Sequence, residues 1–536
     1  MGREFSVKEE KILKKHFSNV DKKVFCLDTP EQADRGALMS RYSRTTHSMR
    51  RVFLNEFINT KKRGEVFYKK VLGQYGDDSI AELGFAHIAI EGISNIAVKT
   101  IEDRRVGLSY LEKSSRYVPW NKKINSKFAF YRDPRILKSR YADDYLDACN
   151  DSFETYSRLI DPITHYIREV YPIERQYFAN NSKKQVLFGK LDSEGADAAQ
   201  RAYLRTIKAK MYDTLRVLLP ASTLTNVGVA GNGRAFEYLL TVLFSSRLEE
   251  EREIAVEIKR ELNKSIGAFI QRSDDSFGRD LQKYHKNIKI ISKKSNPKSD
   301  KQMGQMVKLV KYVNESIAMN DLITGIMYQG ANGTSYDSIL KHVKKLSLVT
   351  KKKIINQHIA LRKNRRYRPP RAFELVEYTF DIQSDYGVFR DLHRHRALTL
   401  QRQNLTCDHD YFTPQEVIGA GLKSEFVECM NNTRHVYNKM KKSMPIQAQY
   451  VVNFAYNYHY MIKMNLREAC HMIELRSTPQ GHPEYRRVAQ QMFRQIISKH
   501  PILGKIIKFV NLEDVDLERL ESEKRFEQKR KNSTKK

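Results

Sequence analysis

The sequence has few cysteines, and none of them forms a recognisable pair. Its five cysteines are scattered over 536 residues, at Cys26, Cys149, Cys407, Cys429 and Cys470. The absence of a C-x-x-C pair excludes a thiolate zinc site and gives no sign of a disulfide framework. Such cysteine usage is typical of a protein kept in a reducing compartment, so we expect a cytoplasmic protein.

Long hydrophobic runs are also missing. The first 15 residues are charged throughout, no stretch of about 18 apolar residues occurs, and the mean hydropathy is −0.61. We therefore expect neither a secretory signal peptide nor a membrane span. The chain is nevertheless 40% hydrophobic and 10% aromatic, which excludes a disordered polymer and supplies ample material for a core.

Negative charge is in short supply. The chain has 95 Lys and Arg residues against 63 Asp and Glu residues, a formal net charge of +32. This excess indicates anionic partners, such as nucleotides, phosphorylated cofactors, nucleic acid or an acidic membrane surface, and charge alone does not choose among them. A Lys-rich surface that only keeps the protein in solution is an equally good interpretation.

The chain divides at a polar, lysine-rich segment that Pro297 interrupts. We interpret residues 292–302 as a linker between an N-terminal copy (1–291) and a C-terminal copy (303–516) of one unit. Residues 517–536 alternate in charge and end in Lys-Arg-Lys-Asn-Ser-Thr-Lys-Lys, so we expect a charged tail that forms a fraying helix and then becomes disordered.

The evidence for two copies is a shared order of short motifs. A Glu-Leu pair occurs at Glu82 and again at Glu374, and an Arg follows 22 positions later each time, at Arg104 and Arg396. An Asn-x-Arg then opens a helical pattern in each half. Apolar alternation in residues 85–90 and 376–382 predicts strands, and residues 249–263 and 485–497 read as amphipathic helices. The fold class predicted for both halves is α+β.

Three polar motifs are candidates for chemistry. Arg394-His395-Arg396 is a dense donor cluster suited to phosphate or an electron-rich ring, or else a solvated basic turn. In Glu112-Lys-Ser114-Ser-Arg116-Tyr the Glu and Arg are four apart, which alone favours a helical ion pair over a nucleotide pocket.

The third motif is the pair of Asn-x-Arg sites. Arg216 precedes Asn232 by 16 residues, and Gln449 precedes Asn465 by the same interval. Beyond Asn465 come Arg467, His471 and Arg476. A polar helix surface is the plain alternative for this group.

Taken together, these motifs resemble the flavin-dependent thymidylate synthases. The family signature runs Arg-His-Arg-x-x-Ser-x-Asn-Glu-x-Ser-x-Arg-Tyr, followed by an Arg before Leu-Pro, then Asn-x-Arg and a last Arg. The C-terminal copy keeps Arg394-His395-Arg396 and Arg476. The N-terminal copy keeps Glu112-x-Ser114-x-Arg116-Tyr117 and Arg216 before Leu219-Pro220. Neither copy has the whole set, yet the two sets are complementary.

The resemblance implies two tandem copies of that fold, a mixed or antiparallel sheet with flanking long helices, which form a pseudo-dimer with one complete composite site. Two chains would rebuild a pseudo-tetramer as a homodimer. The implied reaction is methylation of dUMP to dTMP with FAD as cofactor and with NADPH and methylenetetrahydrofolate as co-substrates.

The resemblance also assigns roles to residues. It implies that Arg476 is catalytic and stabilises negative charge on the uracil ring. It places the following residues on the substrate: Glu112, Ser114, Arg116, Arg216 and Arg394. It places the following residues on the flavin, with His471 where the family usually has Asn: Arg394, His395, Arg396, Asn465, Arg467 and His471.

Other functions stay open at this point. A repurposed or inactive relative could bind nucleic acid, or modify uracil in a polynucleotide, through the basic segment at residues 362–371. A metal site built from His393, His395, His409 and His482 is disfavoured, because flanking arginines repel a cation and no H-E-x-x-H spacing occurs.

Overall fold

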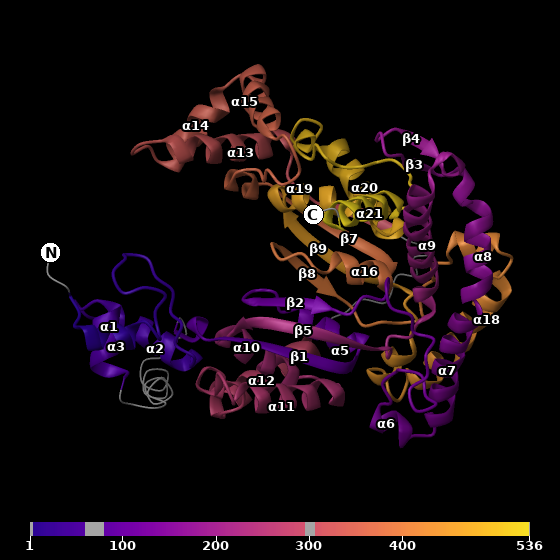
Figure 1. Cartoon of the computed structure of the whole chain (residues 1–536), viewed down its shortest axis with the longest axis horizontal. Coiled ribbons are helices and arrows are strands. Elements are labelled where there is room, and N and C mark those ends of the chain that lie inside the picture. Colours follow the sequence, from indigo (N-terminus) through magenta and orange to yellow (C-terminus); the bar gives the residue numbers. More distant parts are fainter. Residues whose placement is uncertain (1–3, 59–79, 295–305, 535–536) are drawn as a thin grey trace. The chain divides into compact units, whose positions relative to one another are not determined.

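The computed structural model describes residues 4–58, 80–294 and 306–534, and it divides the chain into two compact units (Figure 1). Unit 1 contains residues 1–113 and 224–299, and unit 2 contains residues 114–223 and 300–536. The middle of the N-terminal copy therefore packs with the C-terminal copy. Residues 292–294 of the predicted linker end a helix, and residues 295–302 lie outside the described residues.

Unit 1 is built around a three-stranded antiparallel sheet in the order β1-β5-β2. Helices α10, α11 and α12 lie below this sheet in the view of Figure 1. The strands and helices of unit 1 have these bounds: α1 Val7–Leu13, α2 Gln32–Tyr42, α3 Met49–Glu56, β1 Phe85–Ser94, α5 Asn95–Glu102, β2 Leu108–Glu112, β5 Leu224–Asn232, α10 Gly233–Phe244, α11 Glu249–Leu262 and α12 Ser276–Lys294.

The core of unit 1 forms because one face of each element is apolar. Buried Val227 and Val229 of β5 pack in the same cluster as Phe236, Leu239 and Leu240 of α10. The predicted strand at residues 85–90 is confirmed as β1, and the predicted helix at 249–263 is confirmed as α11.

Unit 2 contains a four-stranded antiparallel sheet in the order β6-β7-β9-β8, together with long helices. Its elements from the N-terminal copy are α6 Pro134–Leu137, α7 Ala142–Arg158, α8 Ile160–Val170, β3 Tyr177–Ala179, β4 Gln185–Leu187 and α9 Ser193–Leu215. Its elements from the C-terminal copy are β6 Met306–Lys311, α13 Glu315–Gly330, α14 Tyr336–Lys345, α15 Leu348–Leu361, β7 Glu377–Asp385, α16 Tyr386–Leu392, β8 Leu398–Arg402, α17 Gln415–Gly419, α18 Lys423–Met440, β9 Asn457–Asn465, α19 Leu466–Arg476, α20 Pro483–Lys499 and α21 Leu520–Thr534.

The two sheets repeat one topology. In each, the strand that ends in Asn lies between the other two, in the orders β1-β5-β2 and β7-β9-β8. Asn232 pairs with the first residue of β1, and Asn465 pairs with the first residue of β7. Each Asn then caps the following helix by accepting a hydrogen bond from the third helical N–H.

A repeated ion pair supports the same correspondence. Arg234 contacts Glu82 at 2.8 Å in unit 1, and Arg467 contacts Glu374 at 3.2 Å in unit 2. These are the Glu of each Glu-Leu pair and the Arg of each Asn-x-Arg. The α+β class and the tandem repeat expected from the sequence are thus confirmed.

Within unit 2, the two copies meet through a short backbone pairing. The amide N–H of Ala221 donates to the carbonyl of Val452, and that of Phe454 donates to Leu219. Pro220 lies opposite Asn453, its counterpart 233 positions later. The same offset relates Asn232 to Asn465, so each copy presents an equivalent segment to the other.

The helix expected in residues 517–536 is present as α21, which continues to Thr534 where we expected a disordered end. Helix α21 packs along α9, where Arg205 contacts Glu523 and Glu527 at 2.6 Å each. The alternating charges of this segment find partners across the helix pair, a non-local match that the local sequence pattern does not reveal. Residues 535–536 lie outside the described part.

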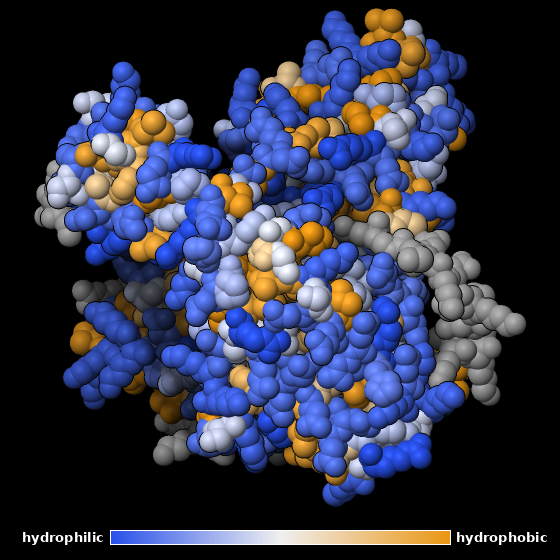
Figure 2. All heavy atoms as spheres, turned by 90° about the vertical axis from the view of Figure 1, so that its right-hand side faces the viewer, coloured by the Kyte–Doolittle hydropathy of each residue, from blue (hydrophilic) through white to orange (hydrophobic). Residues whose placement is uncertain are grey.

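The face shown in Figure 2 is largely hydrophilic, with apolar residues in scattered small groups. This surface agrees with the high charge of the chain. No helix in the described part of the chain combines the length and the apolar character needed to cross a membrane.

Candidate functional site

Four arginines act on one buried carboxylate in unit 2. Asp391 lies near the end of α16, and Nη2 of Arg216 contacts its Oδ2 at 3.0 Å. Burial alone would raise the pKa of Asp391. The nearby positive charges outweigh burial and hold this pKa well below its usual range, and they come from these residues: Arg216, Arg116, Arg394 and Arg476.

These arginines come from both copies. Arg116 and Arg216 belong to the N-terminal copy, whereas Arg394 and Arg476 belong to the C-terminal copy. The complementary arginines that the sequence analysis picked from separate halves are therefore neighbours within one compact unit.

Arg116 is fixed by a second carboxylate. Its Nε donates to Oδ1 of Asp213 at 2.7 Å, and its Nη2 donates to Oδ2 at 2.5 Å, a two-pronged pairing. Burial opposes the charge on both groups, but Arg116 lowers the pKa of Asp213 to about 2, and Asp213 raises the pKa of Arg116. The guanidinium plane of Arg116 is therefore held in one orientation.

Two side chains at the start of α20 line the same cluster. The Tyr485 ring lies 6.0 Å from the Arg116 guanidinium and 5.6 Å from that of Arg476. His482 caps α20, and its Nδ1 accepts the backbone N–H of Glu484 at 3.2 Å. Burial, reinforced by Arg216, lowers the pKa of His482 to about 3, so this ring is neutral at pH 7.

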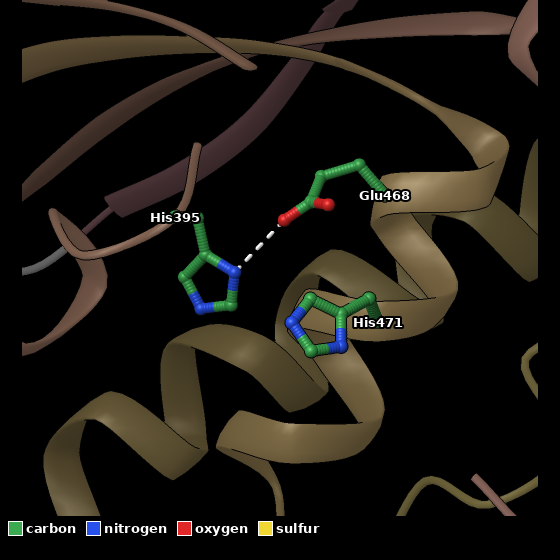
Figure 3. Close-up of side chains that lie close together, drawn as sticks. All are labelled: His395, Glu468 and His471. Atoms are coloured by element: carbon green, nitrogen blue, oxygen red, sulfur yellow. Dashed lines mark hydrogen bonds and ion pairs between the residues drawn. The ribbon is translucent and has the colours of Figure 1, made fainter. Parts of the chain in front are cut away.

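A series of hydrogen bonds links Glu468, in the first turn of α19, through His395 to Arg476 at the end of the same helix; Figure 3 shows the contact between Glu468 and His395. Nε of Arg476, which only donates, lies 3.0 Å from Nε2 of His395, so this ring nitrogen accepts. In the neutral ring, Nδ1 then carries the proton and donates to Oε1 of Glu468 at 2.8 Å. The chain Glu468–His395–Arg476 thereby orients the arginine that the sequence assigned to catalysis.

A cavity of about 450 Å³ in unit 2 lies next to this series of hydrogen bonds, and Glu468 belongs to its lining. The four arginines in its lining give the cavity a strong positive potential that suits phosphate groups. The complete lining is Arg368, Arg371, Glu374, Arg396, Ala397, Leu398, Asn465, Arg467, Glu468 and His471. The sequence analysis had assigned four of these residues to the flavin: Arg396, Asn465, Arg467 and His471.

The structure uses some predicted residues differently. Glu112 belongs to unit 1, where Nζ of buried Lys99 donates to its carboxylate at 2.7 Å, and Arg116 belongs to unit 2. The helix that would bring Glu112 and Arg116 onto one face is not formed, because β2 ends at Glu112 and the chain turns at residues 115–117. Ser114 accepts the backbone N–H of Arg116 at 3.2 Å.

The N-terminal copy does not have the residues needed for hydrogen bonds equivalent to those of Glu468, His395 and Arg476. Asn232 is equivalent to Asn465, an offset of 233 residues. The same offset makes Ala235 the equivalent of Glu468, Tyr238 that of His471 and buried Leu243 that of Arg476. The C-terminal copy in turn has Gln449 in place of Arg216, and its side chain accepts the backbone N–H of Leu405.

The histidines group differently from the sequence-based candidates for a metal site. The ligand atoms of His395, Glu468 and His471 lie within 4.8 Å of one another (Figure 3). Both ring nitrogens of His395 are engaged, one by Glu468 and the other by Arg476. Since arginines also line the adjoining cavity, we interpret His395 and Glu468 as hydrogen-bonding partners that position Arg476, with the His471 ring packed 5.4 Å from the His395 ring.

Part of the basic segment 362–371 serves unit 2 internally. Arg362 is buried and makes two hydrogen bonds of 2.8 Å to Glu474, one to each carboxylate oxygen. Arg368 and Arg371 line the cavity. At least three basic side chains of this segment therefore have roles within the unit.

Sequence reasoning missed the carboxylates that organise the site. Asp391 lies inside the motif around Arg394, and Asp213 lies three residues before Arg216, yet neither belongs to the family signature. The only local signal was their position next to conspicuous arginines. Tyr485 and Glu468 gave no signal beyond helical periodicity.

The fold and site define a duplicated α+β protein with an arginine-rich site assembled from both copies. The chain matches the family model "Thymidylate synthase complementing protein" over residues 28–266 and 308–502. The chain belongs to this family, and the resemblance inferred from its motifs is confirmed.

Full-length relatives share the duplicated length. A UPF0159 protein of Thermoplasma acidophilum is 39% identical over 499 residues, covering 92% of this chain and 98% of the relative. UPF0159 proteins of Chlamydia muridarum and Chlamydia pneumoniae are 34% and 33% identical, and each alignment covers 97% or more of both chains.

Among solved structures, a UMP/dUMP methylase, PolB from Streptomyces cacaoi bound with 5-Br dUMP, covers 40% of this chain and 98% of its own. The identity is 15% and the TM-score is 0.32.

Proposed function

We propose that this protein is a flavin-dependent thymidylate synthase that methylates dUMP to dTMP at one composite site in unit 2. The observation that carries the proposal is the meeting of side chains from both copies: Arg216 contacts Asp391 at 3.0 Å, and Arg116 and Arg476 lie 6.0 and 5.6 Å from the same Tyr485 ring. Family membership supports the same reaction class.

In this proposal Arg116, Arg216 and Arg394 bind the 5′-phosphate of dUMP. Arg116 and Arg216 are held in place by Asp213 and Asp391, so little conformational entropy is lost when the phosphate binds. Nε of Arg216 is buried and has no hydrogen-bond partner among the described residues, which leaves one N–H for the ligand.

Arg476 is proposed as the catalytic residue. Its guanidinium is oriented by the hydrogen bond to His395 and stabilises negative charge that develops on the uracil ring. A preoriented donor of this kind typically contributes about 3 kcal/mol to transition-state stabilisation. Burial lowers the pKa of Arg476, although its ordinary value is so high that it stays charged at neutral pH.

FAD is assigned to the cavity beside this chain. The fit rests on the four arginines of its lining, which match a pyrophosphate, and on the polar side chains of Asn465 and His471. Arg394, His395, Arg396 and Arg467 complete the proposed flavin set. When bound, FAD supplies the redox chemistry, with NADPH as reductant and methylenetetrahydrofolate as one-carbon donor.

The two copies are further proposed to form a pseudo-dimer. The backbone pairing of residues 217–222 with their counterparts 450–455 has the reciprocal form of a two-fold interface. Two chains would then build a pseudo-tetramer. Light scattering tests this assembly, which requires twice the chain mass of 62.8 kDa.

The decisive experiment is the absorption spectrum of the purified protein. Bound flavin together with NADPH oxidation that dUMP stimulates is the expected result. Colourless protein that neither takes up FAD nor binds dUMP contradicts the proposal.

A further inference from the structure

The C-terminal segment that follows α20 is anchored to both parts of unit 2. Nη2 of Arg486 in α20 donates to the Asn511 side chain at 2.9 Å and to the carbonyl of Glu513 at 2.7 Å. Glu518 accepts from Nζ of Lys210 in α9 at 3.1 Å. Residues 503–536 lie outside both family-matched regions, so the motif comparison assigns them no role.

Arg519 is the next residue in this anchored segment. It is only 7% exposed, and its guanidinium lies 4.3 Å from the centre of the Tyr117 ring, next to Arg116 in sequence. Its Nη1 has no hydrogen-bond partner among the described residues. A buried cation with an unused N–H is costly unless another group compensates for it.

The surroundings of Arg519 do not supply that compensation. Burial lowers its pKa, and Arg116 lowers it further by repulsion. Asp213 acts in the opposite direction, but both of its oxygens are already hydrogen-bonded to Arg116. Arg519 therefore adds a fifth arginine to a cluster that contains two carboxylates.

The excess of positive charge fits a doubly charged anion. The five arginines of this cluster are Arg116, Arg216, Arg394, Arg476 and Arg519, and its carboxylates are Asp213 and Asp391. A phosphate monoester carries a charge of about −1.5 to −2 at pH 7 and presents three acceptor oxygens to such donors.

We propose that Arg519, from the C-terminal segment, is an additional ligand of the substrate's 5′-phosphate, held in place by stacking on Tyr117. This inference rests on the proposed function for the identity of the nucleotide. It makes the C-terminal segment part of the substrate site.

The test compares Arg519→Gln with the wild-type full chain by calorimetric titration of dUMP and of deoxyuridine, which lacks the phosphate. A lost charge-assisted hydrogen bond predicts a dUMP Kd about 10- to 100-fold higher, with an unchanged Kd for deoxyuridine. Arg525→Gln is the matched control, because Arg525 lies six residues after Arg519 on α21, is exposed, and donates from Nε to the carbonyl of Glu521 in its own helix. It should leave both affinities unchanged.

An equal dUMP affinity in Arg519→Gln and the wild type overturns the inference, as does an equal loss for deoxyuridine. If Arg519→Gln does not fold, Arg519→Lys takes its place. Lys keeps the positive charge but lacks the paired N–H donors of the guanidinium. A several-fold higher Kd for dUMP with an unchanged Kd for deoxyuridine therefore supports the inference, and an unchanged dUMP Kd contradicts it.

Failure of the proposed function can be distinguished from failure of the role proposed for Arg519. If the wild type does not bind dUMP, the synthase proposal fails, and thermal stabilisation by inorganic phosphate then tests Arg519 directly. Stabilisation of the wild type that Arg519→Gln lacks supports an anion ligand. Equal stabilisation of both proteins, or none in either, rejects it.

Discussion

Replacing Arg216 with Met separates its structural role from its proposed role in binding. Arg216 and Asp391 have side chains that are 3% and 12% exposed, and their ion pair measures 3.0 Å. Met fills much of the same volume but carries no charge. The variant therefore leaves Asp391 buried without its nearest cation.

The expected cost follows from the neighbours of Asp391. Removing one partner of a buried pair typically costs about 3–5 kcal/mol of folding free energy. Since Arg116, Arg394 and Arg476 also act on Asp391, we expect the lower end, about 3 kcal/mol. Loss of the phosphate contact should raise the dUMP Kd about 10- to 100-fold, which corresponds to roughly 1.5–3 kcal/mol.

Urea unfolding and calorimetry measure the two effects separately. Asp391→Asn removes the unpaired charge, so the double variant Arg216→Met/Asp391→Asn should recover most of the lost stability. Compared with Asp391→Asn alone, the double variant should still bind dUMP at least about tenfold more weakly. If Arg216→Met binds dUMP like the wild type while losing stability, Arg216 is only the structural partner of Asp391.

Three further predictions follow from the same site. Arg476→Ala should lower kcat about 100- to 1,000-fold, whereas Arg247→Ala should have a mild effect, because Arg247 is an exposed arginine of the N-terminal copy four residues after Leu243, the equivalent of Arg476; equal losses in steady-state assays would refute a specific role for Arg476. Arg467→Gln should reduce bound flavin in the absorption spectrum, while Arg234→Gln, its counterpart in unit 1, should not; equal occupancy in both contradicts the cavity assignment. His482 has a folded pKa of about 3 against an ordinary 6.5, so its contribution to stability is complete above about pH 6.5 and is lost as the pH falls toward 3. In the wild type, the free energy of unfolding measured with urea should therefore decrease as the pH falls below 6.5. His482→Gln should make this decrease less steep, by up to about 1.4 kcal/mol per pH unit, and an unchanged slope argues against a buried neutral ring.

Much of the fold could be predicted because its signals are local. The caps at Asn232 and Asn465 and the alternation in β1 and β7 depend on residues within a few positions of one another. The repeat was visible for the same reason, since each copy carries the same short motifs in the same order.

The partners of the arginines could not be predicted in this way. Arg116 pairs with Asp213, 97 positions away, rather than with Glu112, four positions away. The choice depends on where β2 ends and on which helix packs beside the turn. Likewise, the alternating charges of α21 suggested a solvated tail, and only the facing arginines of α9 explain why it is held.

The pairing of Pro220 with Asn453 has a consequence for how the two copies vary. At a two-fold axis between identical subunits, one substitution changes both subunits, so it alters both sides of the interface at once. Here a change at position 220 leaves position 453 untouched, so a Pro that offers no N–H can lie opposite an Asn whose side chain donates to Ser152. Each copy is thereby free to lose residues that the other retains, so the single composite site that we propose does not require its equivalent on the other side of the pairing to be preserved.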